Sequence, residues 1–226
     1  MPRIHFHQQL ADLKERLLAM AALAQQAVES SVEAYLQRDA ALCEYVRQNE
    51  NAINAAQREV DELAYDLLAK EQPMAIDLRF ILAVIKINAD IERVGDSAQS
   101  ISDRVRSLIE LPIAEMPVDI PRMASLAEAM VRRALQAFIE ADASIAESVL
   151  SMDDTVDRLN QAAYSTLLNV MKTQPDVAPQ ALSALVISRT LERVADHATN
   201  IAEDVIFWVR GADVRHHKLV TESHQP

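Results

Sequence analysis

The sequence predicts an all-α protein, built as two tandem three-helix bundles that are related by an internal duplication. Three observations support this prediction: there are only 2 glycines in 226 residues, apolar residues recur at helical spacing, and one motif occurs twice. Sandwiches, barrels and glycine-loop nucleotide folds need glycine at their tight turns, so this composition excludes them. The abundant Ala, Leu, Glu, Gln and Arg residues favour helices.

The first half of the chain predicts three helices. Apolar residues at helical spacing indicate the first helix over Leu10–Tyr35. Asp39 then interrupts the pattern and is suited to cap a second helix, which reaches a turn at 71–73. Proline ends that helix because it lacks a backbone donor and restricts the residue before it. A third helix is expected over 75–108.

The second half repeats this order. A fourth helix is expected over 121–140, and Asp142 is suited to cap a fifth helix that includes 145–167. A turn with two prolines separates it from a sixth helix, which ends near Arg210 because Gly211 supplies a stop. Three prolines at 112, 117 and 121 mark the linker between the halves. We therefore expect a first bundle at 1–110, a linker at 111–120, a second bundle at 121–211 and a weakly ordered tail at 212–226.

The duplication is clearest in the third and sixth helices. Residues 92–96 read ERVGD and residues 192–196 read ERVAD, so the offset between the copies is 100 positions. Upstream the offset is 103, where Asp39 matches Asp142 and Ile53 matches Val156. The offset changes in the proline-containing turn, where a difference in length has little effect on stability.

Pairs of acids one helical turn apart are the strongest functional feature. Glu92 and Asp96, and likewise Glu192 and Asp196, share a helix face that lies away from the apolar stripe. Like charges at this spacing destabilise a helix by roughly 0.2–0.5 kcal/mol, yet both copies keep them. A solvated acidic face is the plain alternative, and a cation site is the functional one.

The middle helices supply partners for these acids. Asp153 and Asp157 form a further acidic pair on the fifth helix, and the equivalent positions in the first half are Glu50 and Asn54. If the second and third helices are neighbours, and likewise the fifth and sixth, each bundle presents several oxygen ligands of the kind that magnesium, calcium, manganese and iron prefer. Because Asn54 is neutral, the first site has one negative charge fewer and should bind a cation more weakly.

Composition excludes several other classes. The net charge of -12 argues against nucleic-acid binding, because a duplex repels a field of this sign. Cys43 is the only cysteine, which excludes an intramolecular disulfide, predicts a reducing compartment and makes a buried structural role its default. The chain shows no signal core and no membrane-spanning run of apolar residues, so we expect a cytoplasmic protein.

Enzyme signatures are missing from the sequence. There is no Glu-x-x-His pair of the di-iron type, no phosphate-binding glycine loop and no nucleophile elbow. His197 points about 100° away from Asp196 on a helix, so we interpret it as structural or exposed. The sequence therefore predicts a protein that is not an enzyme.

The duplicated motif at 92–96 and 192–196 resembles the signature of the PhoU family of phosphate-signalling regulators. The segments 73–79 (PMAIDLR), 200–203 (NIAE) and 209–216 (VRGADVRH) are similar to that family as well, and the resemblance covers about residues 9–217. It implies two three-helix bundles with pseudo-twofold symmetry. Ser100 departs from the pattern, since Asn200 stands at the matching position.

The resemblance also implies a function. Members of the family are negative regulators of the phosphate-starvation response, which bridge the ATPase of a phosphate ABC transporter and a membrane sensor histidine kinase. We therefore expect a homodimer that reaches the membrane only through its partners. Some members bind metal clusters through the acidic motifs, with iron, manganese, magnesium and zinc as candidates. By position the metal residues here are Glu92, Asp96, Glu192, Asp196, Asp153, Asp157 and Glu50.

Two other functions stay open at this point. A helical scaffold that binds its partners without metal would tolerate replacement of every acid in the motifs. A carboxylate-bridged metalloenzyme would need open coordination positions and a general acid or base near the metal. The missing Glu-x-x-His pair argues against the enzyme.

Overall fold

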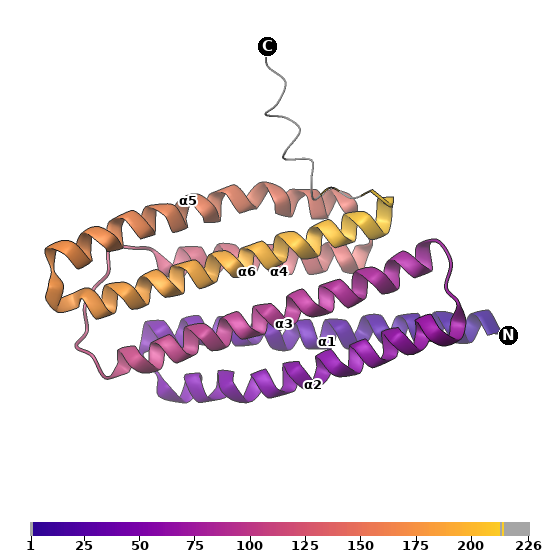
Figure 1. Ribbon diagram of the computed structural model, residues 1–226, viewed down its shortest axis with the longest axis horizontal. Coiled ribbons are helices and arrows are strands. Elements are labelled where there is room, and N and C mark those ends of the chain that lie inside the picture. Colours follow the sequence, from indigo (N-terminus) through magenta and orange to yellow (C-terminus); the bar gives the residue numbers. More distant parts are fainter. Residues whose placement is uncertain (1, 213, 215–226) are drawn as a thin grey trace, which may run out of the picture.

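The computed structural model describes residues 2–212 and 214, and over that range it is all-α without strands, as predicted. Residues 212 and 214 apart, the expected tail lies outside the described residues. The first helix begins at Pro2, earlier than expected, and a proline is compatible with the first turn of a helix. In chain order the elements are α1 (Pro2–Gln37), α2 (Ala40–Glu71), α3 (Ile76–Ile109), α4 (Ile120–Glu140), α5 (Ala143–Thr173), the short 3-10 helix η1 (Pro175–Val177) and α6 (Ala178–Arg210) (Figure 1).

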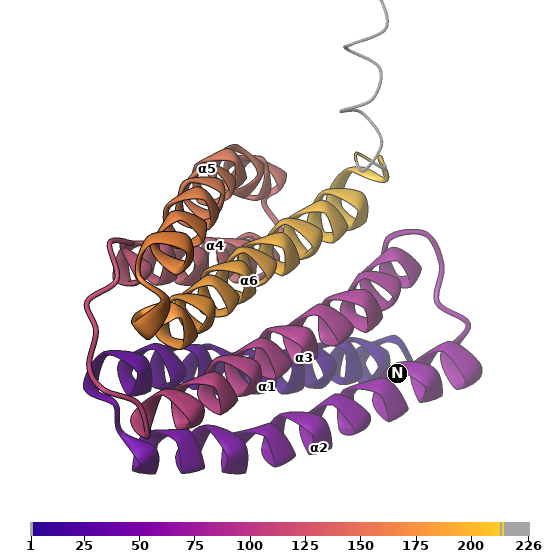
Figure 2. The same ribbon diagram turned by 60° about the vertical axis from the view of Figure 1, so that its left-hand side comes forward.

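The six long helices of the described chain form two bundles that lie against each other. Helices α1, α2 and α3 pack together, and α4, α5 and α6 repeat the arrangement (Figures 1 and 2). The bundles meet mainly where α3 and α6 lie side by side, while α1 and α4 share a shorter contact. No helix within the described range combines the length and apolar character that crossing a membrane requires.

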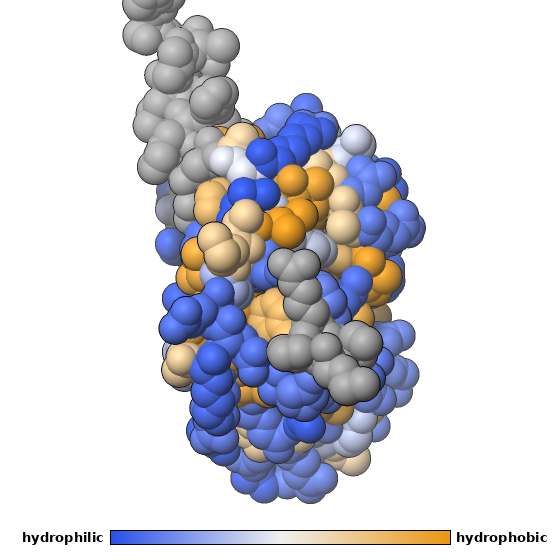
Figure 3. Space-filling model, turned by 90° about the vertical axis from the view of Figure 1, so that its right-hand side faces the viewer, coloured by the Kyte–Doolittle hydropathy of each residue, from blue (hydrophilic) through white to orange (hydrophobic). Residues whose placement is uncertain are grey.

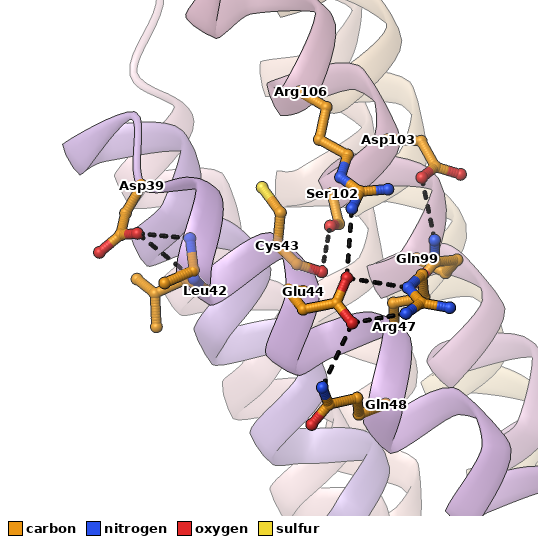
Figure 4. Close-up of polar contacts among 11 residues, drawn as sticks. Asp39, Leu42, Cys43, Glu44, Arg47, Gln48, Gln99, Ser102, Asp103 and Arg106 are labelled. Atoms are coloured by element: carbon orange, nitrogen blue, oxygen red, sulfur yellow. Dashed lines mark hydrogen bonds and ion pairs between the residues drawn. The ribbon is translucent and has the colours of Figure 1, made fainter.

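The two predicted aspartate caps are present and equivalent. Oδ1 of Asp39 accepts hydrogen bonds from the backbone N–H groups of Ala41, at 2.7 Å, and Leu42 (Figure 4). Oδ1 of Asp142 does the same at the start of α5. Arg38 and Ala141 each have a φ of 53° near these caps, so both repeats use the same turn. The caps satisfy backbone donors that the first turn of a helix leaves free.

The apolar core is continuous through both bundles. Buried side chains of α1 to α6 belong to one cluster, and a small second cluster lies between α5 and the start of α6. At one end, three aromatic rings from α3, α4 and α6 join the bundles: Phe80 and Trp208 have ring centroids 5.0 Å apart, and Phe138 lies 5.4 Å from Trp208. Figure 3 shows apolar residues gathered among hydrophilic ones on this end of the molecule.

Buried polar contacts also join the bundles. Nδ1 of His197 on α6 lies 2.9 Å from Oδ1 of Asp90 on α3, and Asn200 donates to the same oxygen at 3.3 Å. An ion pair also joins Lys86 of α3 to Asp204 of α6 at 2.9 Å. His197 therefore has a structural role, one of the two that the sequence predicts for it.

The seam between α2 and α3 is held by a charged cluster on its outer side. The carboxylate of Glu44 accepts hydrogen bonds from Arg47 and Gln48 on its own helix and from Arg106 on α3 (Figure 4). These donors lower the pKa of Glu44 to about 2, with Arg47 as the largest cause. Cys43 beside it is fully buried, as expected, and its carbonyl accepts a hydrogen bond from Ser102 at 3.1 Å.

Candidate cation site

Helices α5 and α6 bring three of the predicted carboxylates together. Asp153 and Asp157 lie one turn apart on α5, where the buried Val156 fixes the orientation of the helix. Asp196 faces them from α6. A carboxylate oxygen of each residue lies within 4.8 Å of those of the other two, and within the described residues no other trio of His, Cys, Asp or Glu approaches this closely. The spacing is suited to a single cation, which binds oxygen atoms at about 2–2.6 Å.

Glu192 stands beside this trio without belonging to it. It lies one turn before Asp196 on α6 and lines an open groove of about 420 Å³ together with Asp157. Tyr164 and Leu185 give the same groove an apolar part, and Arg189 also lines it. A cation held by the trio is therefore open to solvent and to further ligands on one side.

The electrostatics of the site favour a bound cation. Burial raises the pKa of Asp196, and the neighbouring Asp153 and Asp157 raise it further. Burial also raises the pKa of Glu192, with additional repulsion from Asp196 and Asp157. Near neutral pH these carboxylates repel one another, and a cation would remove that repulsion.

The first half has one carboxylate fewer at the matching positions. The positions that match the trio are Glu50, Asn54 and Asp96, so one carboxylate is replaced by an amide. Burial raises the pKa of Glu92, and nearby Asp96 and Glu50 raise it too, which indicates that the acids of α2 and α3 share one face. The sequence predicts weaker cation binding here because of Asn54, and this stays a prediction.

Two buried acids, Asp90 and Asp204, escaped the sequence analysis. Asp90 is 5 % exposed and accepts from His197, Asn200 and Arg93, although it belongs to neither acidic pair. The sequence held one hint of its role: Asp90 is charged, whereas the matching residue of the second repeat is Thr190. That difference alone does not reveal which helix Asp90 faces.

Comparison with known proteins agrees with this architecture. The PhoU domain matches residues 17–105 and 120–205, one match for each repeat. The phosphate-specific transport system accessory protein PhoU homolog of Pseudomonas aeruginosa is 39% identical over 214 residues, which cover 93% of this chain and 88% of that protein. The homolog of the same name in Caulobacter vibrioides is 32% identical and covers 92% of this chain and 91% of its own length.

Solved structures show the same fold. The crystal structure of PhoU from Pseudomonas aeruginosa superposes with a TM-score of 0.87 at 38% identity, covering 92% of this chain and 100% of that one. The phosphate transport system regulatory protein PhoU from Streptococcus pneumoniae gives a TM-score of 0.85 at 29% identity, covering 92% of this chain and 99% of that one. On the family match, the relatives and the fold together, the chain belongs to the PhoU family.

Proposed function

We propose that this protein is a cytoplasmic negative regulator of phosphate uptake and of the phosphate-starvation response. In this role it couples the ATPase of a phosphate ABC transporter to a membrane sensor histidine kinase. Support comes from relatives that are named as accessory and regulatory proteins of phosphate transport. It acts by binding rather than by catalysis, and as a homodimer.

The cation is the proposed source of regulation. Asp153, Asp157 and Asp196 would hold a manganese, iron, magnesium or zinc ion, and the single observation that carries this is their approach within 4.8 Å. Three carboxylates form a hard oxygen donor set, which favours magnesium, manganese or iron over zinc. A bound divalent ion would cancel most of the charge of the three carboxylates, and a partner would recognise this change of charge.

Metal binding is tested by titrating chelator-treated protein with Mn²⁺ in a calorimeter. We expect Asp157→Asn to lower the affinity at least tenfold, because it removes one of three ligands. Asp154→Asn is the matched control, since Asp154 is exposed on the same helix and lies outside the trio. Equal affinities in the two variants, or no heat with either, would overturn the cation site.

Regulation is tested in phosphate-replete cells. Deletion of the gene should raise expression of phosphate-starvation genes, and the wild-type gene should restore repression. A variant with Asp153, Asp157 and Asp196 all changed to Asn separates the two halves of the proposal. Loss of repression supports a cation-dependent regulator, whereas full repression shows that the protein acts as a metal-independent scaffold.

The partners and the subunit number are tested directly. We expect the purified transporter ATPase and the cytoplasmic part of the sensor kinase to bind in pull-down experiments, and light scattering to give the mass of a dimer. A monomer at all concentrations would exclude the homodimer. Failure of both partners to bind would contradict the proposed coupling.

A further inference from the structure

A groove runs along the seam between α1 and α4, on a face that the candidate cation site does not use. Glu29, Val32, Glu33 and Leu36 of α1 follow one another at helical spacing and form one wall. Ala124 and Glu128 belong to the other wall, and the groove has a volume of about 390 Å³. Leu36 is 55% exposed, so its apolar side chain is available to a partner.

The groove continues toward the middle of the molecule. A smaller cavity of about 30 Å³ shares Glu29 and Glu128 with it and has Val94 and Val194 among its lining residues. These two valines come from α3 and α6, which close the seam from the inside. The lining of α1 therefore extends from Gln25 to Leu36, about 17 Å along the helix axis, or three helical turns.

The groove carries more negative than positive charge. Three carboxylates line it, and Arg132 is 3.6 Å from Glu128. Burial raises the pKa of Glu128, and repulsion from Glu29 adds to this against the opposing effect of Arg132. An incoming positive charge would therefore relieve repulsion that Arg132 leaves in place.

The second repeat shows that this charge is particular to one end of the seam. By the offset of 103, Glu29 matches Arg132 and Glu33 matches Gln136, so the other end of the seam lacks these acids. The exposed aliphatic residue is retained, since Leu36 matches Ile139, which is 50% exposed. The two repeats therefore share the exposed aliphatic residue, but only the first repeat has the acidic residues beside it.

We propose that this groove binds an amphipathic helix of a partner protein, one whose apolar stripe is flanked by Lys and Arg residues. The apolar stripe would cover the exposed Leu36, and the basic side chains would face Glu29, Glu33 and Glu128. Two helices that present residues at helical spacing form a groove of the shape that a third helix fills. The charge of the groove selects a basic partner over an acidic one.

The test uses two fluorescent synthetic peptides of 18 residues with the same leucine stripe, one flanked by lysine and one by glutamate. Fluorescence anisotropy should show that the Leu/Lys peptide binds and the Leu/Glu peptide does not. The double variant Glu29→Gln/Glu33→Gln should weaken binding at least tenfold, and Leu36→Ser at least fivefold. The control Glu15→Gln/Glu62→Gln removes the same charge from exposed positions of α1 and α2 and should bind as the wild type does.

Three results would overturn the proposal. If both double variants lose affinity equally, the peptide responds to overall charge and not to the groove. If Leu36→Ser binds as tightly as the wild type, the apolar contact is missing. If Mn²⁺ displaces the peptide, or if Asp157→Asn weakens its binding, the peptide binds to the acids of α5 and α6 and not to the groove. Because the groove shares no residue with the cation trio, these results leave the proposed function untouched.

Discussion

The Cδ1 atom of Ile53 lies 2.9 Å from the position that a Cβ atom on Gly95 would occupy. Helix α2 therefore approaches α3 closely, next to the acids of the first repeat. At the matching positions of the second repeat stand Val156 and Ala195, both fully buried. The second repeat has one carbon fewer on the middle helix (Val156 for Ile53) and one more on the last helix (Ala195 for Gly95). The combined side-chain volume of the pair is therefore conserved.

This relationship predicts the behaviour of Gly95→Ala. Overpacking against Ile53 should lower the free energy of unfolding by about 1 kcal/mol, even though alanine favours the helix. The double variant Gly95→Ala/Ile53→Val copies the second repeat and should recover at least that amount. Urea denaturation followed by circular dichroism measures both. A double variant that is less stable than Gly95→Ala would show that the two positions do not compensate each other.

A second prediction concerns the weaker site of the first repeat. Asn54→Asp restores the acid that the second repeat has at Asp157, so it should add a second bound Mn²⁺ ion per chain in equilibrium dialysis. Asn51→Asp is the matched control, because Asn51 is exposed on the same helix and gains the same charge. Equal Mn²⁺ binding by the two variants would mean that the first repeat has no cation site.

A third prediction follows from the raised pKa of Asp196. The folded state disfavours the charged form, so at pH 7 the metal-free protein should gain about 0.5 kcal/mol from Asp196→Asn, the size of a repulsive pair one turn apart. The penalty in the wild type decreases as the pH falls through the raised pKa. It disappears only below the unfolded value of about 3.9, where the carboxyl is protonated in both states.

The pH dependence of unfolding measures this effect. Wild type and variant should differ at pH 7 and converge as the pH falls below about 4. Saturating Mn²⁺ should reverse their order at pH 7, because the cation binds more tightly to the protein that keeps all three ligands and stabilises it more. A variant less stable than the wild type in metal-free buffer at pH 7 would contradict the repulsion.

A fourth prediction concerns Asp90 between the bundles. Asp90→Ala should lower the free energy of unfolding by about 2 kcal/mol, since it leaves the buried donors of His197 and Asn200 without their acceptor. Thr190→Ala is the control at the matching position, where the hydroxyl donates to the carbonyl of Val186 in its own helix. In guanidinium denaturation, the free energies of unfolding of the two variants should differ by more than 1 kcal/mol. Equal losses would show that the contact between bundles adds nothing.

Much of this fold could be predicted because it depends on local signals. The spacing of apolar residues predicts the helices, and the caps Asp39 and Asp142 act within their own first turns. Even the extra turns at the start of α1 had a signal, since Phe6 is buried and lies one turn before Leu10. Phe6 alone, however, was not enough to extend the apolar pattern of the first helix toward the N-terminus.

The candidate site could be predicted only in part. The acidic pairs at 92/96, 192/196 and 153/157 were found because their spacing lies within one helix. The contact of Asp90 with His197 joins residues 107 positions apart, and it depends on how the two bundles dock. The groove between α1 and α4 depends on the same docking, so neither had a signature in the spacing of residues.

The polar contacts between the bundles give the two repeats separate identities. Asp90 belongs to one repeat, and His197 and Asn200 belong to the other, while Thr190, Ser97 and Ser100 stand at the matching positions. A molecule assembled from two copies of the first repeat would place Asp90 opposite serines, and two copies of the second would place Thr190 opposite His197. The two halves thus carry complementary polar groups, as the subunits of a heterodimer do, and a pair of identical halves would lack this complementarity.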